Sequence, residues 1–152
     1  SQSEREARIT GGEEHCWRLD TEAASNLLRD GVWPLTWTDS IKGIQTVDPI
    51  SFGDVVLARK DTPTSYHLSV TVDDALQAVT DIVRGEDLFE ATHVHRYLQA
   101  LLGLPTPHYH HHSLLTDKDG KRFAKRDKAY TIKAMRENGM TAEAVIAKCN
   151  LP

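Results

Sequence analysis

Cysteine is scarce in this chain, and its two copies lie near opposite ends. Cys16 and Cys149 have no second cysteine close to them. Neither can therefore belong to a zinc site that is built from closely spaced cysteine pairs. We expect both to be ordinary reduced thiols.

Long apolar segments are absent as well. The longest, residues 54–58 and 97–104, are far shorter than the ~20 residues that a membrane span requires. The first eight residues are polar and lack the apolar centre of a signal peptide. We therefore expect a cytoplasmic protein that makes no membrane contact. With 152 residues, of which 39% are hydrophobic, the chain has the size of one domain with a real core.

Positive charge is in the minority, because the net charge is -4. This argues against broad, non-specific coating of nucleic acid. The basic residues are nevertheless concentrated, since eight of the eighteen lie between Lys118 and Arg136. Four of them, in the loop of residues 120–127, can surround a polyphosphate through charge-assisted hydrogen bonds. Taken alone, however, the loop is better interpreted as a solvated basic turn.

Hydrophobic periodicity and turn residues predict strands and helices in alternation, after a polar surface helix and loop in residues 1–14. The expected strands are residues 16–19, 33–38, 52–58, 66–72, 79–84 and 109–115. The expected helices are residues 20–31, 88–103, 130–138 and 141–149. The strand at 52–58 is expected to be covered on both faces, and Asp73 and Asp74 to close the strand at 66–72.

This alternation favours an α/β layered fold with some parallel strand pairing. In such sheets ligands bind beyond the carboxyl ends of the strands. The loops after Val72, Arg84 and Leu115 are therefore the predicted places for chemistry.

The histidines of residues 108–112 suggest a metal site at first sight. Consecutive residues of a strand point to opposite faces, so His110, His111 and His112 cannot all reach one ion. His110 and His112 can share a face, and His108 can join them. We prefer partly buried structural histidines and predict no metal site.

Three stretches carry a family resemblance when they are taken together: residues 54–61 (DVVLARKD), residues 66–88 with YHLSVTVDD and VTDIVRGEDL, and residues 120–127 (GKRFAKRD). In this order and spacing they resemble the carboxyl-terminal half of the catalytic core of class I glutamyl-tRNA synthetases. The resemblance runs roughly from Cys16 to the end of the chain. Its specific part is the Arg-Gly-Glu-Asp segment with the upstream tyrosine and paired aspartates.

The resemblance implies an α/β fold: the carboxyl-terminal part of a class I synthetase Rossmann-type catalytic domain, with a KMSKS-like loop and short terminal helices. Residues 1–50 would be a connecting or insertion segment, residues 51–129 the second half of the Rossmann-type domain with the loop, and residues 130–152 the terminal helices. The family's HIGH signature and its zinc-ligand cysteines, which lie upstream, do not occur in this sequence. We therefore expect a fragment of the enzyme, with little activity alone and with self-association through exposed sheet edges.

Site residues follow from the resemblance by motif position. Tyr66 and Arg84 match the pair that holds the substrate glutamate, and Lys125 matches the catalytic lysine that contacts the ATP phosphates and the leaving pyrophosphate. Arg122 and Arg126 would also bind ATP. In the signature loop an arginine replaces the first lysine, and an alanine replaces the first serine, so a phosphate-facing hydroxyl is lost.

Each site residue has a structural alternative. Arg84 can form a salt bridge with Asp81, Glu86 or Asp87, and Tyr66 can be a strand aromatic with a solvated hydroxyl. The four carboxylates Asp73, Asp74, Glu86 and Asp87 can in principle bind magnesium. We expect them instead to hold Arg84 and the neighbouring loops in place.

The resemblance implies ATP with Mg as a substrate, and L-glutamate and tRNA as partners. Within the family the chain is most similar to a shortened paralogue without an anticodon-binding domain, which transfers glutamate to queuosine of tRNA(Asp). The alternatives are a discriminating or non-discriminating synthetase that charges tRNA(Glu), a non-catalytic nucleotide- or RNA-binding module, and a metal-binding or structural domain built on the histidines.

Overall fold

The computed structural model describes residues 1–29, 31, 33–114 and 131–148. Residues 1–113 form one compact unit, and residues 114–152 belong to a second. The predicted loop of residues 120–127 lies outside the described residues. Among the described helices, none is long and apolar enough to cross a membrane.

A four-stranded mixed sheet forms the centre of the first unit, in the order β3-β2-β6-β5. Its strands are β2 (Thr36–Asp39), β3 (Gly43–Thr46), β5 (Asp81–Gly85) and β6 (His108–His112). Strands β2 and β3 form an antiparallel hairpin, whereas β6 runs parallel to both β2 and β5. The predicted α/β class with parallel pairing is thus confirmed.

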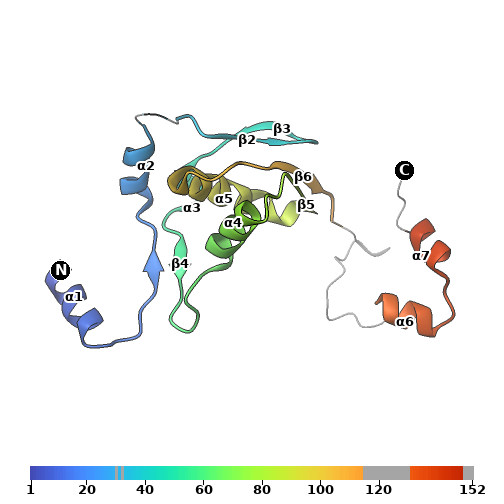
Figure 1. The fold of residues 1–152 in the computed structure, drawn as a ribbon, viewed down its shortest axis with the longest axis horizontal. Coiled ribbons are helices and arrows are strands. Elements are labelled where there is room, and N and C mark those ends of the chain that lie inside the picture. The colour runs from blue at the N-terminus through green and yellow to red at the C-terminus, as the bar shows by residue number, and fades with distance from the viewer. Residues whose placement is uncertain (30, 32, 115–130, 149–152) are drawn as a thin grey trace. The chain divides into compact units, whose positions relative to one another are not determined.

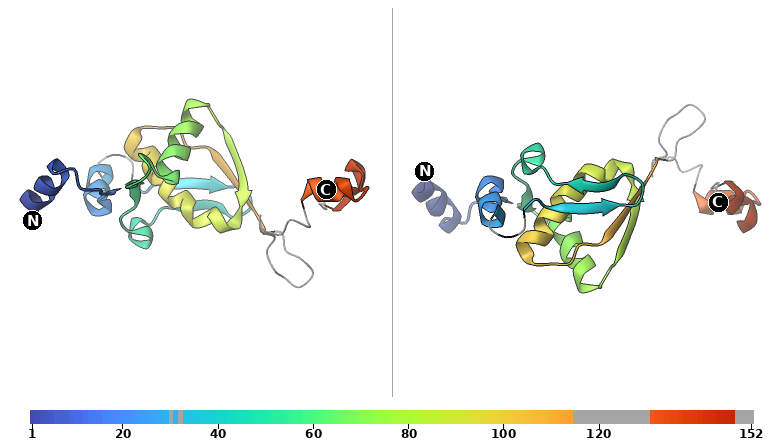
Figure 2. Two further views of the ribbon diagram at one scale, coloured as in Figure 1. Left: turned by 90° about the horizontal axis from the view of Figure 1, so that it is seen from below. Right: turned by 90° about the horizontal axis from the view of Figure 1, so that it is seen from above.

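Helices α4 (Tyr66–Leu76) and α5 (Phe89–Leu102) cover one face of this sheet, as Figures 1 and 2 show. Helix α5 follows β5 through a short 3-10 turn, η1 (Glu86–Leu88), and leads into β6. The predicted helix at 88–103 is confirmed, including its end. Gly103 has a φ of 64°, a left-handed conformation that glycine adopts without a steric cost.

The predicted strand at 66–72 is wrong, because these residues form the first two turns of α4. The Ser65 side chain caps the helix by accepting a hydrogen bond from the Leu68 amide, as serine commonly does at this position. The alternating, β-branched residues favour a strand by propensity, but packing against α5 overrides that local preference. Asp73 and Asp74 accordingly lie inside the helix instead of closing a strand.

The remaining elements of the first unit are shorter: α1 (Gln2–Thr10), β1 (Trp17–Arg18), α2 (Thr21–Arg29), α3 (Pro49–Phe52) and β4 (Val56–Ala58). The helix expected from residue 20 is confirmed as α2. The strand expected at 52–58 is shorter, because Phe52 belongs to α3. It is half-buried and pairs with β1 in a two-stranded antiparallel sheet, so the expectation of a strand covered on both faces is wrong.

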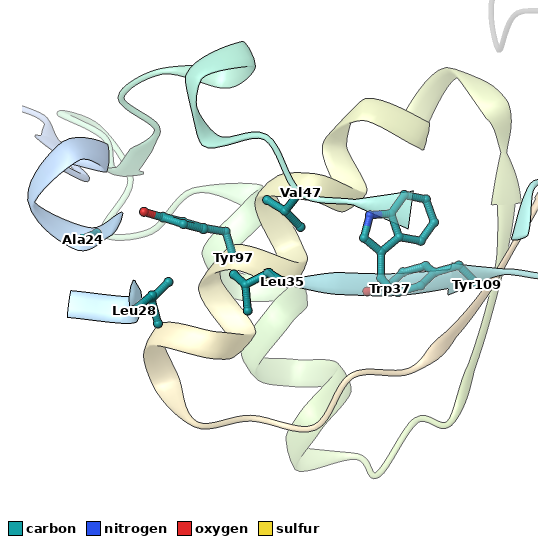
Figure 3. Packing of buried hydrophobic residues seen from close by; sticks show 7 residues of the cluster. All are labelled: Ala24, Leu28, Leu35, Trp37, Val47, Tyr97 and Tyr109. Atoms are coloured by element: carbon teal, nitrogen blue, oxygen red, sulfur yellow. The ribbon is translucent and has the colours of Figure 1, made fainter. Parts of the chain in front are cut away.

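The core lies between the sheet and the helices. Its main cluster of buried side chains, shown in Figure 3, consists of Ala24, Leu28, Leu35, Trp37, Val47, Tyr97 and Tyr109. Trp37 of β2 is 2% exposed, and its ring centroid lies 5.0 Å from that of Phe89 and 5.3 Å from that of Tyr109. It thereby joins β2, β6 and α5.

The described part of the second unit consists of α6 (Ile132–Glu137) and α7 (Ala142–Lys148). This confirms the two helices that were expected there. The division of the chain at residues 50 and 129 stays a prediction. Strands β2 and β3, from residues 1–50, share a sheet with β5 and β6.

Removal of the Trp37 side chain should cost the fold about 3–5 kcal/mol, because the Trp37→Ala change leaves a large cavity in the core. Trp17, which is 55% exposed, provides the matched control, and Trp17→Ala should cost less than about 1 kcal/mol. Urea unfolding of both variants measures the difference. Equal losses would contradict the central position of Trp37.

Candidate functional site

Arg84 lies at the carboxyl end of β5, where the parallel strand leads into η1. Its guanidinium donates from Nε to His111 Nε2 at 3.1 Å and from Nη1 to His95 Nδ1 at 3.3 Å. Nη2 donates to the Thr92 hydroxyl. The side chain is half-buried, and its guanidinium lies 5.4 Å from the centroid of the Tyr109 ring. Three neutral groups from α5 and β6 thus hold one cation.

Tyr66 is the first residue of α4, and its side chain is 55% exposed. Its ring centroid lies 5.8 Å from that of His95, the same imidazole that accepts from Arg84. The structure therefore brings Tyr66 and Arg84 together around one histidine. Their role in binding glutamate stays a prediction.

Asp39 and His111 form a buried pair that contacts Arg84 through His111. His111 Nδ1 lies 2.7 Å from Asp39 Oδ2, which also accepts from the His111 backbone amide at 3.1 Å. Asp39 Oδ1 accepts from the amides of Ile41 at 2.9 Å and Lys42 at 2.8 Å. Burial alone raises the pKa of Asp39, but these hydrogen bonds, foremost the one from His111, outweigh burial and lower the pKa to about 2. The carboxylate therefore stays ionised.

The histidines of this cluster are neutral at physiological pH. Burial, helped by the charge of Arg84, lowers the pKa of His95 from 6.5 to about 3. Burial also lowers the pKa of His67 and that of His111, although Asp39 opposes the shift of His111. Since Arg84 donates to His95 Nδ1, the proton of His95 is assigned to Nε2, which lies 3.0 Å from His67 Nδ1. In this arrangement Arg84 Nη1 donates to His95 Nδ1, and His95 Nε2 donates to His67 Nδ1.

The described side chains do not form the structural salt bridge that was the alternative for Arg84. Among the ion pairs between them, none includes Arg84. Burial raises the pKa of Asp74, and the charge of Arg84 opposes this shift only in part. Three of the five guanidinium N–H groups have partners among the described residues, so two remain available to a ligand. Such a cation suits a carboxylate.

The alternation expected for the histidine run is confirmed. His111 is buried, whereas its neighbours His110 and His112 are half-buried and exposed. His110 Nδ1 lies 2.6 Å from the Ser40 hydroxyl. Within the described ranges, no three His, Cys, Asp or Glu side chains gather as ligands of one metal ion.

Three predicted site residues, Lys125, Arg122 and Arg126, lie outside the described residues. Sequence reasoning missed Asp39, His95 and Thr92 altogether. The signal that the sequence offers for Thr92 and His95 is their three-residue spacing, which places both on the same face of helix α5.

The fold and the cluster define an α/β domain whose sheet presents a half-buried arginine at the carboxyl end of a parallel strand. The family model of class I tRNA synthetases (E and Q), catalytic domain, matches residues 2–151. The chain belongs to this family.

Several curated proteins are similar to the chain. It is 62% identical to the glutamyl-Q tRNA(Asp) synthetase of Rhodobacter capsulatus over 57% of the chain and 31% of that protein. It is 49% identical to the protein of the same name from Nocardia farcinica, over 62% of the chain and 30% of that protein. The glutamate–tRNA ligase 1 of Novosphingobium aromaticivorans is 33% identical over 97% of the chain and 31% of the ligase. The chain thus spans about a third of the length of these relatives.

A solved structure shows the same fold. The glutamate-tRNA synthetase of Elizabethkingia anophelis superposes with a TM-score of 0.54 at 23% identity, covering 83% of the chain and 30% of that protein. At this identity the likeness concerns the fold alone.

Acidification should destabilise the fold below pH 6.5, because His95 is held neutral with a pKa of about 3. The stability that this depressed pKa contributes is present above pH 6.5 and is lost as the pH falls towards 3. Each proton that only the unfolded chain binds costs about 1.4 kcal/mol per pH unit. His67 and His111, whose pKa values are also lowered, add to this slope.

His95→Gln removes the titrating group, so its free energy of unfolding should depend less on pH between 6.5 and about 5. Urea unfolding at several pH values measures this dependence. The exposed His108 on β6 provides the control, because His108→Gln makes the same substitution on the surface, outside the cluster. An unaltered slope in His95→Gln would show that His95 is protonated in the fold.

Proposed function

We propose that the protein containing this chain activates L-glutamate with ATP, forming glutamyl-adenylate, and transfers the glutamyl group to tRNA in the cytoplasm. One observation supports this most strongly. In a chain of the class I (E and Q) synthetase family, a cation held by neutral acceptors at the carboxyl end of a parallel strand shares the contact with His95 with an exposed tyrosine. Ligands of α/β sheets bind at this edge.

In the proposed reaction Arg84 binds a carboxylate of glutamate with its two remaining N–H groups, and the Tyr66 hydroxyl orients the amino acid. An oxygen of the α-carboxylate attacks the α-phosphorus of ATP, which enters as its magnesium complex, and the bond to pyrophosphate breaks. Lys125, with Arg122 and Arg126, contacts the phosphates and stabilises the charge that develops on the leaving pyrophosphate.

For the acceptor we propose queuosine of tRNA(Asp). The identity of 62% to a glutamyl-Q tRNA(Asp) synthetase supports this choice. The second candidate acceptor is tRNA(Glu), which the match of a glutamate–tRNA ligase over 97% of the chain favours. Charging assays with queuosine-containing tRNA(Asp) and with tRNA(Glu) distinguish the two.

We also propose that this chain self-associates through its sheet edges. Among the described strands, β3 and β5 end the four-stranded sheet. Each carries an exposed branched residue, Ile44 on β3 and Val83 on β5. Apolar strand edges of this kind favour pairing with another chain.

Loss of the Lys125 ammonium group should slow adenylate formation ~10²-fold or more, as expected for a contact made in the transition state. Lys125→Ala is measured in the full-length protein by glutamate-dependent ATP–pyrophosphate exchange. Lys133 provides a control on helix α6, where it pairs with Glu137 at 3.9 Å on the surface. Exchange that is unchanged in Lys125→Ala would remove Lys125 from the mechanism. No exchange even by the wild-type protein would favour a non-catalytic binding module.

Substitution of Arg84 by lysine should raise the KM for glutamate about tenfold or more and leave the KM for ATP unchanged. A lysine keeps the charge but cannot form the planar fork that donates to three acceptors and a carboxylate. Arg96→Lys is the control, because Arg96 donates to the Thr36 carbonyl of β2 at 2.9 Å, apart from the cluster. A changed KM for ATP with an unchanged KM for glutamate would contradict the role of Arg84.

A further inference from the structure

The bond between Arg84 and His111 depends on which nitrogen of the imidazole carries the proton. Arg84 Nε always bears a hydrogen, so His111 Nε2 must be the unprotonated nitrogen to accept from it. A proton on Nε2 would set two donors against each other at 3.1 Å. The Thr92 hydroxyl lies 3.0 Å from the same nitrogen and 3.2 Å from the Leu88 carbonyl, to which it donates, so its contact with Nε2 is compatible with either position of the proton.

Asp39 determines the position of this proton. Its two carboxylate oxygens face four donors: the amides of Ile41 and Lys42 at Oδ1, and the amide and Nδ1 of His111 at Oδ2. An ionised carboxylate can only accept, so Nδ1 of His111 carries the proton. The side chains of His111 and Asp39 are both 0% exposed, and the pair therefore keeps this state without competition from water.

We propose that Asp39 and His111 are positioning residues for Arg84: Asp39 fixes the Nδ1–H form of His111, and His111 then holds the Arg84 guanidinium so that its free N–H groups face the ligand. This inference rests on the proposed function, because the ligand that Arg84 serves there is glutamate. Strand register gives the bond a fixed geometry, since Arg84 and His111 are direct partners across the β5–β6 pairing.

Asp39→Asn tests the proton position. If the asparagine oxygen stays with the Ile41 and Lys42 amides, its NH2 group faces His111 Nδ1. The proton of His111 then moves to Nε2 and opposes Arg84. Long-range 1H–15N NMR of the 152-residue chain identifies the protonated nitrogen. We expect Nδ1–H in the wild type and Nε2–H in the variant.

The effect on substrate is measured by pyrophosphate exchange in the full-length protein. Asp39→Asn and His111→Leu should each raise the KM for glutamate about tenfold, with the KM for ATP unchanged. His111→Gln places an amide oxygen near the position of Nε2 and should recover most of this loss. His108→Gln, on the same strand but exposed, should match the wild type. Urea unfolding identifies any variant that fails to fold. If Asp39→Asn fails to fold, the KM values of the two His111 variants still decide whether His111 positions Arg84.

An Nε2–H form of His111 in the wild type would overturn the proposal. So would a KM for glutamate in folded His111→Leu within about twofold of the wild-type value, or an equal change in the KM for ATP. Absence of exchange in the wild-type protein would instead refute the proposed function and the claim about glutamate. In that case the NMR measurement still decides separately whether Asp39 and His111 hold Arg84.

Discussion

The parallel pairing of β5 with β6 is the constraint on which the site depends. Its register sets Arg84 opposite His111, and the connection between the two strands, helix α5, supplies Thr92 and His95. One β-α-β unit therefore contributes Arg84 and all three of its acceptors. Strand β2 adds Asp39 through its own parallel pairing with β6. The hydrogen bonds of the sheet fix the backbone positions of Arg84 and His111, and the side-chain hydrogen bonds then hold the guanidinium.

The three acceptors of the Arg84 guanidinium are neutral, and this has an electrostatic consequence. A half-buried arginine needs hydrogen-bond partners, because leaving a charged donor unsatisfied away from water is costly. Carboxylates would satisfy it but would also cancel its charge. Histidines kept neutral by burial, such as His95 and His111, together with the Thr92 hydroxyl, satisfy the donors and leave the positive charge in place. Among the described residues, the carboxylate that joins this hydrogen-bond network is that of Asp39, and it contacts His111 and not the guanidinium. The site therefore remains attractive to an anion.

Sequence reasoning predicted the parts of the fold that local patterns determine. The helix at 88–103, its end at Gly103 and the strand that carries Arg84 follow from periodicity and turn chemistry, and they are confirmed. The partners of Arg84 could not be predicted in this way, because no local pattern encodes the register between β5 and β6 or the approach of Asp39 from β2. Each of these contacts joins residues 8 to 72 positions apart. Family resemblance predicts Arg84 itself as a site residue, but not which side chains hold it.

The wrong prediction at 66–72 shows how secondary structure changes the meaning of a residue. In a strand, Tyr66 and His67 would point to opposite faces, and only one of them could approach Arg84. At the start of α4 both rings lie near His95, with centroids 5.8 Å and 5.2 Å from it. His67 Nδ1 also accepts from His95 Nε2, the nitrogen opposite the one that faces Arg84. His95 thus links the start of α4 to the guanidinium, and both Tyr66 and Arg84 contact this imidazole because residues 66–76 are helical.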